Sequence, residues 1–477
     1  MRIRLSVATL LLYAAGLCAA PYPQSARIIR GRKPYAVLVT RDTYKNPKWR
    51  KVVEALRAKH RASIIVYDRD VEAPAVLDAL RRLFPRYACF VVRPEEADRP
   101  FVCAVHRLTR KLDADPYTDL LWGILTGYDA ASALKTARVK KPLSCRRALG
   151  GTSIPMDVFP EVRWYSEGSK GVMWEKKAGG VPVKKKCPPD TTKAIVDSLN
   201  NWKPDVFVTS GHATERDWQI GYSYKNGQLR CREGRIVGID LKGNVWPVDS
   251  PNPKVYLPAG NCLIGRIPDR NCMALAFMKS CGVTQMAGYV VATWYGYAGW
   301  GVLEYFFKQP GRFTASESFF CNEQALLWQL HSRFPNLANL KFDSYALERN
   351  PGLLQAFARK HNIRNKDALG LLWDRDTLAF YGDPAWEARL LPGPCAWEQE
   401  LHKRRGVYTV TIKAKKNCTL KRPPVVLFPR RIKKPTLLEG AQYKPVITDN
   451  FLLIGGLKTL KAGEVYRVRF RARAASR

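Results

Sequence analysis

The chain has 477 residues, of which 46% are hydrophobic, and these values predict two or three folded domains and exclude a disordered protein. Its 79 Lys and Arg residues against 41 Asp and Glu residues give a formal net charge of +38, which favours anionic partners or surroundings. The basic residues are spread along the whole chain, and no recognition motif with interleaved aromatic residues is found, so a specific nucleic-acid site is not predicted.

The first residues, Met1 to Ala20, are typical of a secretory signal peptide. Arg2 and Arg4 precede an apolar stretch from Leu5 to Leu17, and small residues follow at Cys18-Ala19-Ala20. We therefore expect an exported protein that is secreted, periplasmic or held at the cell surface, with residues 1–20 removed.

Strand and helix patterns alternate in the first part of the mature chain. Apolar runs and helical spacings predict three strands and two helices, at Tyr35–Thr40, Trp49–Leu56, Ser63–Tyr67, Val76–Phe84 and Tyr87–Val92. This alternation predicts a parallel sheet with helices on its faces. The carboxylates of Asp113–Asp119, further on, are compatible with a cation site, but a solvated loop that caps a helix is the simpler interpretation.

Two apolar runs in the middle of the chain each end in a chemically reactive side chain. The first, Asp205–Ser210, leads through Gly211 to His212, and the second, Lys254–Asn261, leads to Cys262. Short apolar runs bounded by small residues predict core strands that deliver their last side chain to a surface loop.

A histidine and a cysteine in this setting predict a cysteine peptidase. A thiol with its ordinary pKa near ~8.5 is mostly protonated at neutral pH, so an imidazole that holds the thiolate as an ion pair lowers the barrier to carbonyl attack. His212 is the expected partner of Cys262. The backbone N–H groups of Cys262 and Ala213 are the expected donors to the oxyanion.

The segments around these two runs complete the second α/β part. A β-rich excursion with a hairpin turn at Lys225–Gln228 is expected between them, then a helix at Met273–Lys279 and a strand at Met286–Ala292. Residues Gly282–Leu303 carry no charge over a length that would cross a bilayer. Their polar residues and glycines predict a core strand and a Gly-rich loop instead, so no transmembrane anchor is predicted.

Four side chains near the two runs are candidates for substrate binding. Trp294 and Tyr295, in the Gly-rich loop, are expected either to line the pocket for the residue before the scissile bond or to pack in the core. Glu215 and Asp217 are the acidic candidates for a specificity pocket. The sequence does not indicate which substrate residue is preferred before the scissile bond.

The C-terminal part of the chain, its tail, has a β-strand pattern in place of the alternating strands and helices that precede it. From Val407 onward, strands alternate with Pro- and Gly-rich turns, and the last strand, Val465–Arg473, alternates apolar and basic residues. We expect a small β-sandwich module at 405–477, joined through the polar stretch Lys403–Gly406, with few contacts across the junction.

Cysteine usage agrees with a free thiol. Of twelve cysteines, Cys18 lies in the signal peptide, so an odd number remains and at least one cannot pair in an oxidising compartment. Cys262 is the expected free thiol, and Cys272 and Cys281 are candidates for disulfides. No two cysteines form a CxxC motif, so no zinc site is expected.

These features resemble the gingipain-like cysteine peptidases, relatives of caspases and clostripain. The matching features are the strand that ends in Ser210-Gly211-His212, the strand that ends at Cys262, and their order along the chain. Phe380–Trp386 looks like the Gly-Asp-Pro segment near the end of that catalytic domain, and the tail looks like the immunoglobulin-like domain that commonly follows it. The resemblance covers most of the mature chain.

The resemblance implies a caspase-like or gingipain-like catalytic domain of two α/β subdomains, at 30–140 and 141–400, followed by an immunoglobulin-like β-sandwich. It implies an endopeptidase with a Cys262 and His212 dyad, a thioester intermediate, a protein or peptide substrate and no cofactor. Two positions depart from the family, which usually has Gly where Ala213 stands and a small residue where Asn261 stands.

Two other functions stay open from the sequence. The first is a catalytically inactive relative that acts as a surface or binding protein, with the basic charge and the tail as its binding features. The second is another acyl-transfer enzyme, a transpeptidase or an amidase, that uses the same dyad.

Overall fold

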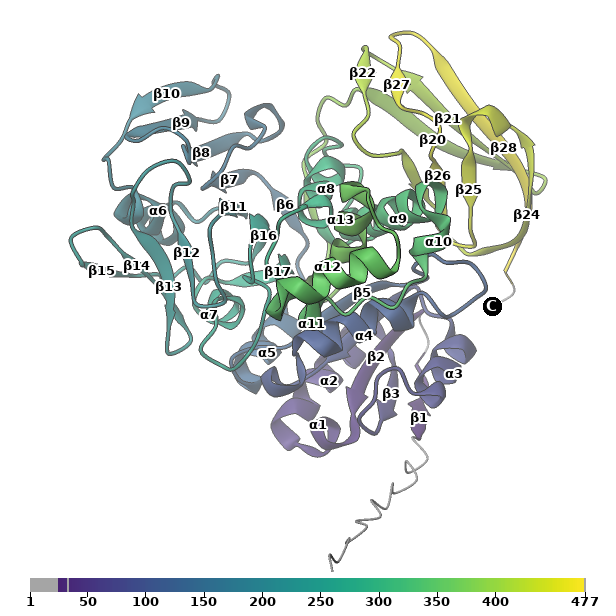
Figure 1. The fold of residues 1–477 in the computed structure, drawn as a ribbon, viewed down its shortest axis with the longest axis horizontal. Helices are drawn as coiled ribbons and strands as arrows, with labels where there is room; N and C mark the ends of the chain where they lie inside the picture. The colour runs from purple at the N-terminus through teal and green to yellow at the C-terminus, as the bar shows by residue number, and fades with distance from the viewer. Residues whose placement is uncertain (1–24, 32–33, 476–477) are drawn as a thin grey trace, which may run out of the picture.

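The computed structural model describes residues 25–31 and 34–475, which form a mixed α/β part with one large sheet and a β-rich tail (Figure 1). The expected signal peptide, Met1–Ala20, lies outside the described residues. The α/β class with a large, mostly parallel sheet is confirmed.

Within the described residues, the large sheet runs through 13 strands. From one edge to the other they are β1 (Ala26–Ile29), β3 (Ser63–Tyr67), β2 (Tyr35–Thr40), β4 (Tyr87–Val91), β5 (Leu121–Leu125), β18 (Leu378–Tyr381), β17 (Val283–Tyr289), β16 (Lys254–Asn261), β11 (Val206–Gly211), β7 (Arg147–Gly150), β8 (Glu161–Tyr165), β9 (Val172–Lys176) and β10 (Val183–Lys186). The expected strands at 35–40 and 63–67 have the bounds that the apolar runs predict.

Helices cover this sheet and fill the space beside it (Figure 1). They are α1 (Arg41–Lys45), α2 (Pro47–His60), α3 (Pro74–Leu83), α4 (Arg99–Thr109), α5 (Ala130–Ala137), α6 (Thr192–Asp197), α7 (Met273–Ser280), α8 (Tyr297–Phe306), α9 (Ala315–Arg333), α10 (Pro335–Ala338), α11 (Ser344–Arg349), α12 (Pro351–Lys360) and α13 (Lys366–Asp374). Side-chain hydrogen bonds cap the first turn of several of these helices. At the start of α2, the Asn46 side-chain oxygen accepts from the N–H groups of Lys48 and Trp49.

The two halves of the large sheet meet at β18. This strand pairs parallel to β5 on one side and antiparallel to β17 on the other. The chain leaves β18 through Gly382 at φ +113, where an added Cβ would lie 2.2 Å from the Thr284 carbonyl oxygen, so only glycine fits. The turn delivers Asp383 into the interior.

Asp383 is the buried anchor of this junction. The Tyr35 hydroxyl donates to its Oδ1 at 2.8 Å, and His60 Nε2 and Lys59 Nζ lie 2.6 and 2.9 Å from its Oδ2. Burial alone would raise the pKa of Asp383, but the His60 hydrogen bond and the Lys59 charge outweigh burial and hold this pKa well below its ordinary value. The Gly-Asp-Pro segment therefore fastens β18 to β2 and α2.

We expect Asp383→Ala to lower the free energy of unfolding by about 3–5 kcal/mol, because it leaves the 9% exposed Lys59 side chain without its counter-charge. Denaturant titration at pH 7 measures the loss. The contribution of Asp383 is present above the unfolded pKa of about 3.9 and is lost as pH falls through the lower folded value, so wild type and variant converge in strong acid.

Asp68→Ala is the matched control for this prediction. Asp68 pairs with Arg41 at 2.9 Å in a solvent-exposed ion pair, and such pairs contribute about 1 kcal/mol or less. Equal losses in the two variants would contradict the role of Asp383 as a buried anchor.

The remaining strands form small sheets. One lies beside the large sheet in the order β12 (Asp217–Gln219), β13 (Gln228–Arg232), β14 (Arg235–Ile239) and β15 (Val245–Pro247), and β6 (Leu143–Cys145) pairs with β19 (Ala388–Leu390). The tail holds β20 (Trp397–Arg404), β21 (Val407–Ala414), β28 (Val465–Ala474) and β24 (Ile432–Glu439) in one sheet, β22 (Cys418–Thr419) with β27 (Thr459–Leu460), and β23 (Val425–Leu427), β26 (Phe451–Ile454) and β25 (Pro445–Ile447) in another.

The expected hairpin turn at Lys225–Gln228 is wrong. β12 and β13 pair through Gln219 and Gln228, so residues 220–227 form a long loop between them. The Asn226 side chain is buried and bonds the Thr191 backbone and hydroxyl. The tight turn lies instead at Glu233-Gly234, where both residues have positive φ.

The tail is β-rich as predicted, but it begins earlier and contacts the α/β part more closely than the sequence suggested. β20 pairs antiparallel with β21 along its whole length, so the sheet starts before the expected junction near Arg405. Phe451 packs against Tyr117 and Phe320, in a hydrophobic cluster that the tail shares with the α/β part. The expectation of few contacts across the junction is therefore wrong, and the immunoglobulin-like character stays a prediction.

Candidate functional site

His212 and Cys262 leave the large sheet side by side. β11 and β16 are neighbouring parallel strands, and Gly211 stands opposite Asn261 in their register. The next residue on each strand is therefore His212 and Cys262, at the carboxyl ends where parallel sheets place their sites. Gly211 has φ +94, a conformation that favours glycine, and it turns the chain out of the strand at this point.

Both side chains line one open pocket with a volume of about 720 Å³. The wall also contains Ala213, Thr214 and residues of the β12 to β14 sheet. Among the contacts of the described residues, no direct hydrogen bond joins the imidazole to the thiol. Catalytic hydrogen bonds are often loose before substrate binds, so the shared pocket is the relevant geometry.

The Cys262 sulfur has a backbone partner that the sequence did not indicate. The Thr293 N–H lies 3.2 Å from Sγ, where it can donate to a thiolate. Thr293 belongs to the loop that follows β17, the strand next to β16. This N–H group and the Cys262 sulfur therefore lie within hydrogen-bond distance at the carboxyl end of β16.

Tyr222 packs on the other catalytic candidate. Its ring stacks on the His212 imidazole, with centroids 5.3 Å apart and an interplanar angle of 23°. The Tyr222 side chain is exposed, and its backbone N–H donates to the Glu167 carbonyl oxygen. Tyr222 thus restrains the ring orientation of His212 from the solvent side.

Asn261 explains one of the two departures from the gingipain-like pattern. This side chain is fully buried, and its amide group donates to the Gly211 carbonyl oxygen at 2.9 Å. Its carbonyl oxygen accepts from the Thr209 hydroxyl at 2.5 Å. Asn261 therefore ties the end of β16 to the end of β11, one residue before each candidate catalytic side chain.

The loop that carries Thr293 is held by contacts from outside the sheet. The Trp373 indole donates to the Ala292 carbonyl oxygen at 3.0 Å, and the Ala292 N–H donates to Glu348 Oε1 at 2.5 Å. Glu348 in turn pairs with Arg99 of α4 at 2.6 Å. The position of the Thr293 N–H is thus fixed by α4, α11 and α13.

Of the four residues expected to bind substrate, only one lines the pocket of His212 and Cys262. Asp217 lines the pocket of His212 and Cys262. Trp294 and Tyr295 do not line this pocket; the Tyr295 hydroxyl bonds Asp367, and its ring lies against Gly370 of α13. Glu215 forms an ion pair with Arg266 at 3.7 Å and is not a wall residue.

All eleven cysteines in the described part of the chain are free. The suggestion that Cys272 and Cys281 form disulfides with other cysteines is therefore wrong, and both are buried as small apolar side chains. Burial raises the pKa of each of these two thiols, to about 12 and about 11. Cys262 differs because it is partly exposed and lines a pocket with a histidine.

Three carboxylates far from this pocket come together in a way that suits a cation. Asp113, Asp119 and Asp449 each place an oxygen within 4.8 Å of the others. Asp119 is only 2% exposed, and its Oδ2 has no hydrogen-bond partner among the described residues. The loop leads directly into β5 rather than capping a helix, which corrects the simpler interpretation of 113–119. Carboxylate oxygens are ligands of Ca²⁺ and Mg²⁺, so these residues could hold such an ion.

We expect Asp119→Asn to flatten the pH dependence of stability in buffer that contains a chelator. Burial, followed by the charges of Asp113 and Asp115, raises the pKa of Asp119 to about 9. The folded state then binds this proton more tightly than the unfolded state between about pH 4 and pH 9, so stability falls as pH rises, by up to about 1.4 kcal/mol per pH unit. Urea titrations from pH 5 to pH 9 measure the slope.

The control for this slope is Asp157→Asn, at an exposed position. It should keep the wild-type slope. If the free energy of unfolding changed with pH equally in wild type and Asp119→Asn, Asp119 would not titrate in the folded state as its surroundings predict.

Comparison with known proteins finds similar solved structures, among them the following two. No family model and no curated protein matches the sequence. A complex of the pro- and mature domains of Porphyromonas gingivalis RgpB matches 92% of this chain and 93% of its own, with 11% identity and a TM-score of 0.39. A structure described as a protease matches 93% of this chain and 98% of its own, with 8% identity and a TM-score of 0.38. The chain is similar to the gingipain RgpB, from the family that its sequence motifs resemble.

Proposed function

We propose that this chain is a cysteine endopeptidase in which Cys262 is the nucleophile and His212 is the base. The observation that carries the proposal is the register of β11 and β16, which brings the two side chains into one pocket. The secretory pattern of Met1–Ala20 supports export to the periplasm, the cell surface or the medium. No helix within the described residues is long and apolar enough to span a membrane.

The proposed reaction follows from the positions of these groups. His212 takes the thiol proton, and the Cys262 thiolate attacks the scissile carbonyl carbon, so a C–S bond forms and an oxyanion develops. The N–H groups of Cys262 and Ala213 are the proposed oxyanion donors. The protonated imidazole then gives its proton to the leaving amine, and a thioester remains. Water, deprotonated by His212, attacks the thioester and releases the acid and the thiol.

The open pocket agrees with an extended substrate. Its wall is built largely from a sheet edge and loops, and it is not closed into a cavity sized for one small molecule. A protein or peptide chain can lie across such a surface. The net charge of +38 favours acidic substrates or an anionic cell surface as its location.

A thiol-reactive peptide probe tests the proposal against an inactive binding protein. Labelling at Cys262, mapped by peptide mass spectrometry, is expected for an active thiolate and not for a buried or unactivated thiol. Product analysis on a peptide library then separates hydrolysis from transpeptidation or amide release from a side chain. Labelling without peptide cleavage would leave the dyad in place and overturn the endopeptidase assignment.

We expect Asn261→Asp to lower kcat by about 10- to 100-fold with little change in KM. The carboxylate can still accept from Thr209, but it cannot donate to the Gly211 carbonyl oxygen, so the strand ends that carry His212 and Cys262 lose their tie. Steady-state kinetics and the pH profile of kcat/KM measure the effect. A buried carboxylate lowers stability, so the kinetics are measured well below the melting temperature of the variant, where it is folded. An unchanged kcat under these conditions would contradict the role of Asn261.

A further inference from the structure

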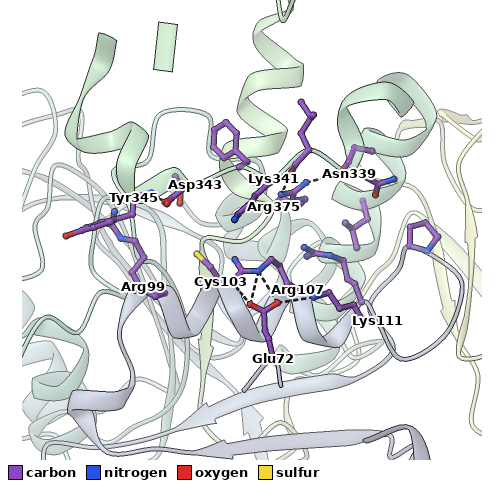
Figure 2. A pocket seen from close by; sticks show the side chains of 18 of the residues that line it. Glu72, Arg99, Cys103, Arg107, Lys111, Asn339, Lys341, Asp343, Tyr345 and Arg375 are labelled. Carbon is purple, nitrogen blue, oxygen red and sulfur yellow. Dashed lines mark hydrogen bonds and ion pairs between the residues drawn. The ribbon is translucent and has the colours of Figure 1, made fainter. Parts of the chain in front are cut away.

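A second pocket lies between α4 and the segment that leads into α11. Its volume is about 670 Å³, and it shares no wall residue with the pocket of His212 and Cys262. Figure 2 shows side chains of α4 along one side of this hollow and side chains of residues 339–345 along the opposite side. A hollow of this size suits a small molecule rather than a folded partner.

The wall of this pocket is strongly basic. It contains six cationic side chains and two carboxylates, Glu72 and Asp343. The cations are Arg99, Arg107, Arg110, Lys111, Lys341 and Arg375. They come from three separate parts of the chain, and the fold gathers them around one space.

The neighbouring carboxylates do not neutralise this charge. Glu72 pairs with both Arg107 and Lys111. Behind the wall, Asp376 pairs with both Arg110 and Arg375, and Glu348 pairs with Arg99. Four carboxylates therefore face six cations, counting Asp343, whose side chain caps the first turn of α11. Two positive charges remain in excess.

Two observations indicate that this excess positive charge acts on groups in the pocket. Burial, and then the charges of Arg110 and Arg375, lowers the pKa of His331, which also lines it. Arg110 Nη1 is buried without a hydrogen-bond acceptor among the described residues. A buried donor without an acceptor costs free energy that a nearby anion would offset.

We propose that this pocket binds a small oxyanion with two or more phosphate or carboxylate groups. Arg107 and Lys111, with side chains 40% and 52% exposed, and Lys341, on the exposed rim, are the direct contacts. The more deeply buried Arg110 and Arg375 contribute charge from below. Guanidinium groups match the geometry of phosphate and carboxylate oxygens, and two excess positive charges match a ligand that carries at least two negative ones. This inference goes beyond the peptidase proposal and does not depend on it.

Calorimetric titration of the full chain in 150 mM salt tests the proposal, with pyrophosphate and citrate as separate probes. We expect one saturable site, and the double variant Lys111→Gln/Lys341→Gln should weaken its affinity by at least about tenfold. Both lysines are exposed, so the variant is expected to fold. Binding of pyrophosphate alone identifies a phosphate ligand, binding of citrate alone a carboxylate ligand, and binding of both a general site for multivalent oxyanions.

The control must match the change in net charge, because a chain with a net charge of +38 attracts anions over its whole surface. Lys184→Gln/Lys186→Gln removes the same two charges from the exposed strand β10. It should leave the affinity at the wild-type value. Equal weakening in the two variants, no weakening in either, or the absence of saturable binding of both probes would overturn the proposal.

Discussion

Replacing Cys262 with Ala is expected to abolish peptide hydrolysis while leaving the melting temperature close to that of wild type. The reaction needs a sulfur that forms the thioester, and Ala offers no substitute. The side chain is partly exposed at a strand end, so its loss removes little packing. Hydrolysis of a fluorogenic peptide library, measured beside thermal unfolding, gives both results.

Cys187→Ala is the matched control. Cys187 is also partly exposed, but burial raises the pKa of its thiol and it lies outside the pocket. The control should keep full activity, and iodoacetamide should label Cys262 before Cys187. Turnover that survives in Cys262→Ala would remove this residue as the nucleophile.

His212→Ala is expected to lower kcat/KM by about 10²- to 10⁴-fold, the range for loss of a general acid and base. The pH profile of kcat/KM should change with it, because the proposed general base is removed. Kinetics from pH 5 to pH 9 on a purified, folded variant measure both effects.

Two other histidines serve as controls for this prediction. His402 is exposed on β20, where it pairs with Glu400, and His402→Ala should leave the rate unchanged. His331 lies in the basic pocket and not beside Cys262, so His331→Ala should also leave the rate unchanged. An unaltered pH profile in His212→Ala would require a different base.

The sequence predicted the strands that carry the site because their signal is local. Short apolar runs mark β2, β3, β11 and β16 without reference to the rest of the chain, and a glycine lies near the end of the last two. Their order in the sheet, and the insertion of β18 between β5 and β17, depends on contacts between distant residues that no local pattern encodes. β20 was missed because its alternation is masked by charged residues on the exposed face.

In the candidate site, too, the residues with a local sequence signal could be predicted, and those that depend on distant contacts could not. His212 and Cys262 could be found because each stands at the end of a recognisable strand. Thr293 could not, because it contributes a backbone N–H, and a backbone group leaves no mark in the residue type. Asn261 was noticed only as an unusual residue, and its role needed the three-dimensional neighbours Thr209 and Gly211.

The shared sheet has a consequence for how the chain would behave if a protease cut it. β18 comes from late in the sequence, yet it is hydrogen-bonded between β5 and β17, and the main hydrophobic cluster extends across both halves. A nick in the exposed segment Lys177–Val181 would therefore not release two separate pieces. The fragments would remain associated as a two-chain protein held by backbone hydrogen bonds and a common core. They would separate on a denaturing gel but migrate together in gel filtration.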